Sequence, residues 1–390
     1  MRFSAVLAFV VAGFEQAYAE ASSETSIEEA NKQKYPEYAE FMRHWGYKWE
    51  PYELTTDDGY ILTTFRITEK KGEKIVPDES LNPVMLMHGL GCDATSWVDP
   101  SWDPFGMPLP LRLFDRGFDV YMASNRGTKY CQQHTSLALD DPKYWEFSWA
   151  EMGLYDDVSN IKFIKERTGK KVSYVGVSQG TVQMFYALSK IEEEFLKDNL
   201  YTFAAIDPCT IDVSEGNRLY EDGLFHFSEY GIYAFGGPNW DQDQETICSN
   251  FDQEICDYAL GCAGGEPVSL KTNVHWAQNV IQQRFQEYAP DYMQDEVETD
   301  LINLGSIKHV PVTIWSGFLD TTCANAQALE TAKEIGERVT YMRTLPWADH
   351  GYWGGPLTGG IYKELEARLI DPEIRPNPQD SPDKLAIDTN

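Results

Sequence analysis

The sequence predicts an α/β fold, in which helices cover both faces of a mostly parallel sheet. Three observations carry this prediction. Short apolar runs alternate with amphipathic stretches of helical period along most of the 390-residue chain. A Gly-x-Ser-x-Gly sequence stands at 176–180, between one such run and the following helix. One long segment, 207–306, interrupts the alternation and is expected to be an insertion.

Turn residues and apolar runs locate the individual elements. Asp57-Asp58-Gly59 separates two alternating stretches, which favours an antiparallel hairpin at one edge of the sheet. Short apolar runs predict buried strands, and longer periodic stretches predict the covering helices. The expected strands are 52–56, 60–66, 83–87, 119–123, 172–177, 201–206, 312–315 and 339–343, and the expected helices are 109–116, 151–168, 181–195 and 324–336.

The segment 207–306 is rich in glycine, cysteine and aromatic residues and has no buried β-run. We expect it to be a cap that packs over the carboxyl edge of the sheet. Proline and aspartate dominate the last residues, which predicts a mobile tail. The expected division is a signal peptide at 1–19, a first core part at 20–206, the cap or lid at 207–306, a second core part at 307–370 and the tail at 371–390.

The N-terminus has the features of a secretory signal peptide. Arg2 supplies a positive charge, residues 3–14 form a short apolar run, and Ala17-Tyr18-Ala19 is a small-residue cleavage sequence. The sequence therefore predicts the secretory route, with an extracellular or lysosomal (digestive-vacuole) destination.

The seven cysteines fit an oxidising compartment with at least one free thiol, because their number is odd. Cys248, Cys256 and Cys262 lie close together in the predicted cap, and a Cys248–Cys256 disulfide is the candidate pairing. Zinc binding is the alternative, but no Cys-x-x-Cys and no nearby histidine pair supports it. The other cysteines are isolated in the sequence: Cys92, Cys131, Cys209 and Cys323.

The net charge of −30 argues against nucleic acids and anionic membrane surfaces as partners, because both would be repelled. Beyond the N-terminus no apolar run is long enough to span a bilayer. We expect no metal and no other cofactor. The oligomeric state stays open, with a monomer as the expectation.

Ser178 is the candidate nucleophile. It stands between Gly176 and Gly180, and between a predicted strand and a predicted helix, as a nucleophile elbow requires. The two glycines lack a Cβ atom, so the strand and the helix can approach while the serine occupies a tight turn. A serine hydroxyl reacts only after a base takes its proton, and that base needs an acid to orient it.

Candidates for the base and the acid follow two later strands. Asp320 comes after the strand 312–315 and His350 after the strand 339–343. Groups at the carboxyl ends of parallel strands converge. The order serine, aspartate, histidine is that of the α/β-hydrolase fold. We therefore expect this fold, with a mostly parallel sheet of eight strands. Asp349 is an alternative acid, but adjacent residues normally point in different directions.

The negative oxygen that forms during ester attack needs two backbone N–H donors, each contributing about 3 kcal/mol to the lowering of the barrier. Gln179, directly after the nucleophile, is the first candidate. The second is Leu90, in the loop His88-Gly89-Leu90-Gly91 after a predicted strand. We expect His88 to brace this loop by hydrogen bonding.

Several segments match a known family: 45–47, 52–62, 88–90, 125–127, 144–152, 174–181, Cys248-Ser249-Asn250 with Cys256, and His275-Trp276. On these segments the chain resembles the acid lipase family, which includes gastric lipase and lysosomal acid lipase. The resemblance implies hydrolysis of neutral lipid esters, triacylglycerols or sterol esters, at a lipid–water interface and under a mobile lid. It also implies that Ser178, Asp320 and His350 form the triad and that Leu90 and Gln179 are the oxyanion donors.

Other functions stay open at this point. A short-chain carboxylesterase, or an acyltransferase that uses an alcohol in place of water, would use the same serine chemistry. An inactive α/β-hydrolase that only binds a ligand usually lacks one member of the triad. All three candidates are present in this chain.

Overall fold

The computed structural model describes residues 27–101, 106–210, 234–235, 266–289, 299–350 and 359–374. The predicted signal peptide and the candidate Cys248–Cys256 disulfide lie outside these residues. So do most of the predicted cap segment and nearly all of the predicted tail.

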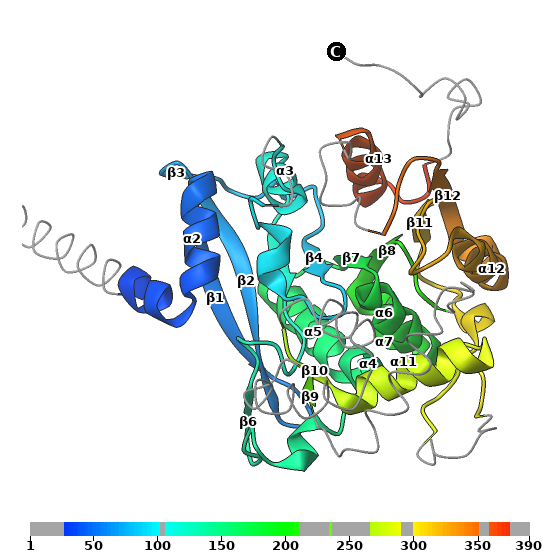
Figure 1. The fold of residues 1–390 in the computed structure, drawn as a ribbon. Coiled ribbons are helices and arrows are strands. Elements are labelled where there is room, and N and C mark those ends of the chain that lie inside the picture. Colours follow the sequence, from blue (N-terminus) through cyan, green and yellow to red (C-terminus); the bar gives the residue numbers. More distant parts are fainter. Residues whose placement is uncertain are drawn as a thin grey trace, which may run out of the picture.

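A mixed, mostly parallel sheet forms the centre of the molecule (Figure 1). In spatial order its main path is β1 (Tyr47–Thr55), β2 (Tyr60–Lys70), β5 (Val120–Ala123), β4 (Val84–Met87), β7 (Val172–Val177), β8 (Leu200–Ile206), β11 (Val312–Gly317) and β12 (Val339–Leu345). Neighbouring strands are parallel from β5 to β12, whereas β1 and β2 form an antiparallel hairpin at one edge. The short strands β3 (Glu73–Lys74) and β6 (Gln133–His134) also pair with β2, which makes ten strands. The expected mostly parallel sheet is confirmed, with the eight expected strands on its main path and two short strands in addition.

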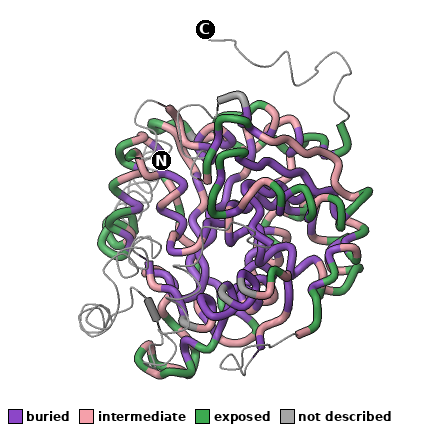
Figure 2. The backbone as a smooth tube through the Cα atoms, turned by 45° about the vertical axis from the view of Figure 1, so that its right-hand side comes forward, coloured by how far each residue is buried: buried purple, intermediate pink, exposed green. Residues whose placement is uncertain are grey.

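Helices cover both faces of the sheet and enclose two hydrophobic cores. In β4, Met85 and Met87 belong to one core and Val84 and Leu86 to the other, because successive side chains point to opposite faces. Figure 2 shows the resulting buried interior. One core is covered by α2 (Pro36–Trp45), α3 (Leu109–Asp115) and α13 (Gly359–Ile370), and the other by α5 (Val158–Thr168), α6 (Gln179–Lys190), α7 (Glu193–Asn199) and α12 (Asn325–Ile335).

The helix expected over 151–168 contains a π-helical segment. The helices α4 (Trp149–Glu151), η3 (Met152–Asp157) and α5 follow one another without a break. A Cβ atom at Gly153 would lie 2.2 Å from the carbonyl oxygen of Gln183 in α6. The glycine therefore allows η3 and α6 to pack closely.

The helix after the serine motif is shorter than expected, since α6 ends at Lys190 and not near 195. Ile191 adopts an extended conformation with φ −77° and ψ 147°, and its side chain packs against the core. The chain then turns into α7 at Glu193. The extended backbone at the partly buried Ile191 thus separates α6 from α7.

A disulfide joins Cys209, just after β8, to Cys323, just after β11. The two cysteines stand 114 positions apart in the sequence. The parallel pairing of β8 with β11 brings them together. Among the described helices, none combines the length and the apolar character needed to cross a membrane.

Candidate active site

The serine stands on a strained turn between β7 and α6. Ser178 has φ 51° and ψ −120°, a conformation that L residues rarely adopt. A Cβ atom at Gly176 would lie 2.6 Å from the carbonyl oxygen of Gly180. A Cβ atom at Gly180 would lie 2.7 Å from the carbonyl oxygen of Met87 in β4. Both glycines are therefore required for this turn.

A hydrogen-bonded chain links the three side chains that the sequence singles out. His350 Nε2 lies 2.9 Å from Ser178 Oγ, and His350 Nδ1 lies 2.8 Å from Asp320 Oδ2. Asp320 Oδ1 also accepts hydrogen bonds from the backbone N–H groups of Thr322 (2.8 Å) and Cys323 (2.7 Å). These two bonds fix the orientation of the Asp320 side chain. The Asp320–His350 pairing is the expected one, rather than a pairing with Asp349.

The loops after β11 and β12 hold the acid and the base together. Phe318 N–H donates to Leu345 O at 2.9 Å, and Leu319 N–H donates to Ala348 O at 2.8 Å. A Cβ atom at Gly317 would lie 2.5 Å from Ala348 O, so only glycine permits this approach. The two loops therefore form one unit.

The candidate oxyanion donors lie on either side of the nucleophile. Gln179 begins α6, and a Cβ atom at Gly89, beside Leu90, would lie 3.1 Å from Ser178 Cβ. In the described part of the chain, neither the Leu90 N–H nor the Gln179 N–H donates a hydrogen bond to a protein acceptor. Both can therefore serve an oxygen atom beside Ser178.

His88 braces the loop that carries Leu90, as expected. Its Nε2 accepts a hydrogen bond from Asn125 N–H at 3.1 Å, which leaves Nδ1 to donate to Gly89 O at 2.8 Å. Burial lowers the pKa of His88. The neutral ring thus fixes the peptide group before Leu90.

A buried polar network below the elbow has no counterpart in the sequence predictions. Tyr174 O–H donates to Gly180 O at 2.8 Å and lies 3.2 Å from both carboxylate oxygens of Asp157. Gln183 Nε2 donates to Asp157 at 2.9 Å and to Asn125 Oδ1 at 3.1 Å. Burial raises the pKa of Asp157 well above its usual value. The matching segments 125–127 and 174–181 include Asn125, Tyr174 and Gly180 of this network, but the sequence predictions gave these residues no part in it.

Part of the predicted cap contacts the elbow directly. Trp276, in α11 (Leu270–Gln282), donates from Nε1 to Gln179 Oε1 at 2.9 Å. His275 stacks on Trp149 with the ring centres 3.8 Å apart. Burial lowers the pKa of His275 to about 3, so this ring is neutral. The helix α11 therefore helps to fix the first turn of α6.

A second junction ties the predicted cap to the loop that carries Leu90. Glu266 N–H donates to Gly91 O at 3.3 Å, and Glu266 Oε2 accepts from Lys129 N–H at 2.7 Å. Lys129 Nζ lies 2.9 Å from Glu266 and 3.4 Å from Asp93. Burial and the nearby Asp93 carboxylate raise the pKa of Glu266 to about 7, although Lys129 opposes this shift.

Replacing Glu266 with glutamine is expected to flatten the dependence of stability on pH. With its pKa raised from 4.5 to about 7, Glu266 keeps a proton in the folded state that the unfolded chain releases. Its stabilising contribution is therefore complete below about pH 4.5 and is lost as the pH rises to about 7. The expected change is on the order of 3 kcal/mol. Thermal unfolding of wild type and E266Q at several pH values measures it.

The exposed Glu53, which pairs with Lys34, provides the matched control for the loss of one carboxylate. The difference in melting temperature between wild type and E53Q should stay nearly constant over this pH range. Parallel curves for wild type and E266Q would contradict the role of Glu266.

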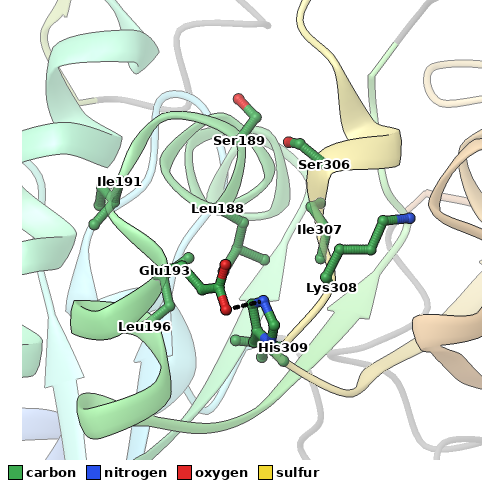
Figure 3. A pocket seen from close by; sticks show the side chains of 10 residues that line it. Leu188, Ser189, Ile191, Glu193, Leu196, Ser306, Ile307, Lys308 and His309 are labelled. Carbon is green, nitrogen blue, oxygen red and sulfur yellow. Dashed lines mark ion pairs between the residues drawn. The ribbon is translucent and has the colours of Figure 1, made fainter.

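A small pocket lies away from the triad. It has a volume of about 90 Å³ and contains an ion pair between Glu193 and His309, with the two atoms 2.5 Å apart (Figure 3). Its residues precede β8 and β11, whereas Ser178 and Asp320 follow the carboxyl ends of β7 and β11. We therefore assign it no part in ester chemistry.

Comparison with known proteins identifies the family. Residues 38–100 match the family model of a partial alpha/beta-hydrolase lipase region. Human lipase member M is 35% identical over 377 residues, which cover 84% of this chain and 84% of that protein. Human lysosomal acid lipase/cholesteryl ester hydrolase is 33% identical over 316 residues, 72% of this chain and 76% of that protein. Human gastric triacylglycerol lipase is 29% identical over 376 residues, 85% and 90% of the two chains. At this identity and coverage, the chain belongs to the acid lipase family of α/β-hydrolases.

Proposed function

We propose that the protein is a serine lipase that hydrolyses carboxylic ester bonds of neutral lipids through an acyl-enzyme on Ser178. The observation that carries this proposal is the hydrogen-bonded chain from Ser178 through His350 to Asp320, with distances of 2.9 Å and 2.8 Å. Membership of the acid lipase family makes the protein a hydrolase that acts on carboxylic esters.

The reaction begins when Ser178 Oγ attacks the ester carbonyl and His350 Nε2 takes the hydroxyl proton. The N–H groups of Leu90 and Gln179 stabilise the negative oxygen of the tetrahedral intermediate. The C–O bond of the ester then breaks, and His350 returns the proton to the leaving alcohol. Water repeats these steps on the acyl-enzyme and releases the fatty acid, while Asp320 stabilises the protonated His350 ring.

Neutral lipid esters are the proposed substrates on two grounds. The relatives include a gastric triacylglycerol lipase and a lysosomal acid lipase/cholesteryl ester hydrolase. In addition, large apolar side chains are exposed on the loops beside Asp320 and His350: Phe318 is 63%, Leu319 54% and Trp347 42% exposed. Apolar side chains grouped around a site favour contact with a lipid surface.

The proposed cap and the proposed location follow from the same observations. The contact between Trp276 and Gln179 supports a cap formed by 207–306 over the carboxyl edge of the sheet. The predicted signal peptide and the Cys209–Cys323 disulfide support the secretory route, because disulfides persist in oxidising compartments.

A fluorophosphonate probe combined with a series of ester substrates tests this function. The probe is expected to label Ser178, as mapped by peptide mass spectrometry, because it reacts with activated serine hydroxyls. Hydrolysis should extend from p-nitrophenyl acetate to p-nitrophenyl palmitate, and to emulsified triolein or cholesteryl oleate. Activity confined to the shortest esters would favour the carboxylesterase alternative. Ester exchange with an added alcohol that exceeds hydrolysis would favour the acyltransferase alternative.

A further inference from the structure

A second buried carboxyl group lies behind the proposed triad. Asp207 directly follows β8, the strand between β7, which leads to Ser178, and β11, which leads to Asp320. Its φ angle is 47°, in the left-handed region that aspartate occupies more readily than most residues. Its backbone N–H donates to Trp315 O at 2.8 Å. The backbone therefore places this side chain at the carboxyl ends of the same strands.

The side chain of Asp207 faces the acid and the base. It is completely buried, and its Oδ1 accepts a hydrogen bond from Gly317 N–H at 3.0 Å. Within the described part of the chain, Oδ2 has no hydrogen-bond partner. One carboxylate oxygen of Asp207, one of Asp320 and a ring nitrogen of His350 lie within 4.8 Å of one another.

A negative charge on Asp320 opposes ionisation of the buried Asp207 carboxyl group at this short distance. Asp320 accepts three hydrogen bonds, from His350, Thr322 and Cys323, whereas Asp207 accepts one. Asp207 is therefore the member of the pair that holds a proton. Burial, then Asp320 and more weakly Asp349, raise the pKa of Asp207 well above its usual value.

The groups that face Asp207 come from each neighbouring loop. They are Asp320 on the loop after β11 and Asp349 and His350 on the loop after β12. If the charge of Asp320 is removed, the strongest charged group that opposes ionisation of Asp207 is gone. Asp207 can then lose its proton and face the His350 ring as a carboxylate.

We infer that Asp207 is a second acid of the catalytic system. In the wild-type protein it is a neutral positioning residue that holds Gly317, at the start of the Asp320 loop. When Asp320 is missing, its carboxylate stabilises the protonated His350 in place of Asp320. This inference rests on the proposed serine mechanism.

A double-mutant cycle with D207N, D320N and D207N/D320N tests this role. The asparagine oxygen can still accept the bond from Gly317 N–H, so D207N alone should lower kcat by less than about 3-fold. D320N should lower kcat by about 10²-fold, and the double variant by about 10⁴-fold, the loss typical of a triad without its acid. The losses should appear in kcat and not in KM, because Asp207 does not contact the substrate.

The pH profile separates this role from a structural one. The residual activity of D320N should rise with pH as Asp207 ionises, and this rise should disappear in D207N/D320N. If D207N has the same fold-effect in both backgrounds, or if the activity of D320N does not change between about pH 6 and about pH 9, the inference is wrong. If D207N unfolds, a flat pH profile of D320N still contradicts the inference. Full activity of D320N together with full activity of S178A would instead overturn the proposed function.

Discussion

Replacing Ser178 with alanine is expected to lower kcat for ester hydrolysis by at least about 10⁴-fold. Alanine removes the oxygen that His350 Nε2 contacts at 2.9 Å and that would form the acyl-enzyme. The rest of the site stays intact, so substrate binding should change little. Steady-state hydrolysis of a p-nitrophenyl ester and of emulsified triolein measures the loss. Labelling by the fluorophosphonate probe should disappear in the same variant.

Two further variants separate loss of the nucleophile from loss of the fold. S178G removes the strain of a φ angle of 51°, which costs about 1–3 kcal/mol in a non-glycine residue. Glycine adds about 0.5–1 kcal/mol of backbone entropy cost, so S178G should be as stable as wild type or more stable. S189A, near the other end of α6, should keep full activity. Hydrolysis by S178A at the wild-type rate would show that another residue is the nucleophile.

The sequence predicts the proposed triad well because each member follows a strand of a parallel sheet. In such a sheet, the order of the strands decides which loops meet, and the loops after 172–177, 312–315 and 339–343 lie at one edge. The sequence also offered a steric argument, because the glycines on either side of Ser178 leave room for a tight turn. The structure bears this out, since a Cβ atom at either glycine would overlap a backbone oxygen. Periodicity and turn chemistry were therefore sufficient to locate the strands of the main path, although not their spatial order.

The same reasoning overlooked contacts that depend on tertiary packing. Cys209 and Cys323 carry no spacing signal, and only the adjacency of β8 and β11 pairs them. The π-helical segment depends on the fit of Gly153 against Gln183, which helical periodicity does not report. Asp207 could have been found, because it directly follows a predicted strand in the same way as Asp320. A search for carboxylates after every strand, rather than after the last two, would have identified it.

Removal of the Cys209–Cys323 disulfide is expected to lower both stability and activity. The bond joins two cysteines 114 positions apart in the sequence, and loss of such a constraint typically costs about 2–5 kcal/mol of unfolding free energy. It also lies beside the reacting groups, since Cys209 Sγ is 3.9 Å from Ser178 Oγ and Cys323 Sγ is 3.9 Å from His350 Nε2. The variant C209S/C323S, studied by thermal unfolding and ester hydrolysis, measures both effects.

The expected loss of activity follows from the position of Asp320. Cys323 N–H donates to Asp320 Oδ1 at 2.7 Å, so the disulfide fixes one of the donors that orient the acid. Without this constraint the Asp320 loop can move relative to β8, and kcat should fall by about 10-fold, as expected for a misplacement of the catalytic groups by a fraction of an ångström. A reducing agent that breaks the bond should reproduce this loss in the wild-type protein and have a much smaller effect on C209S/C323S, in which only the candidate Cys248–Cys256 bond could still be reduced. Equal inhibition of both proteins by the reductant, or a variant as stable and active as wild type, would contradict a role of the disulfide in holding Asp320.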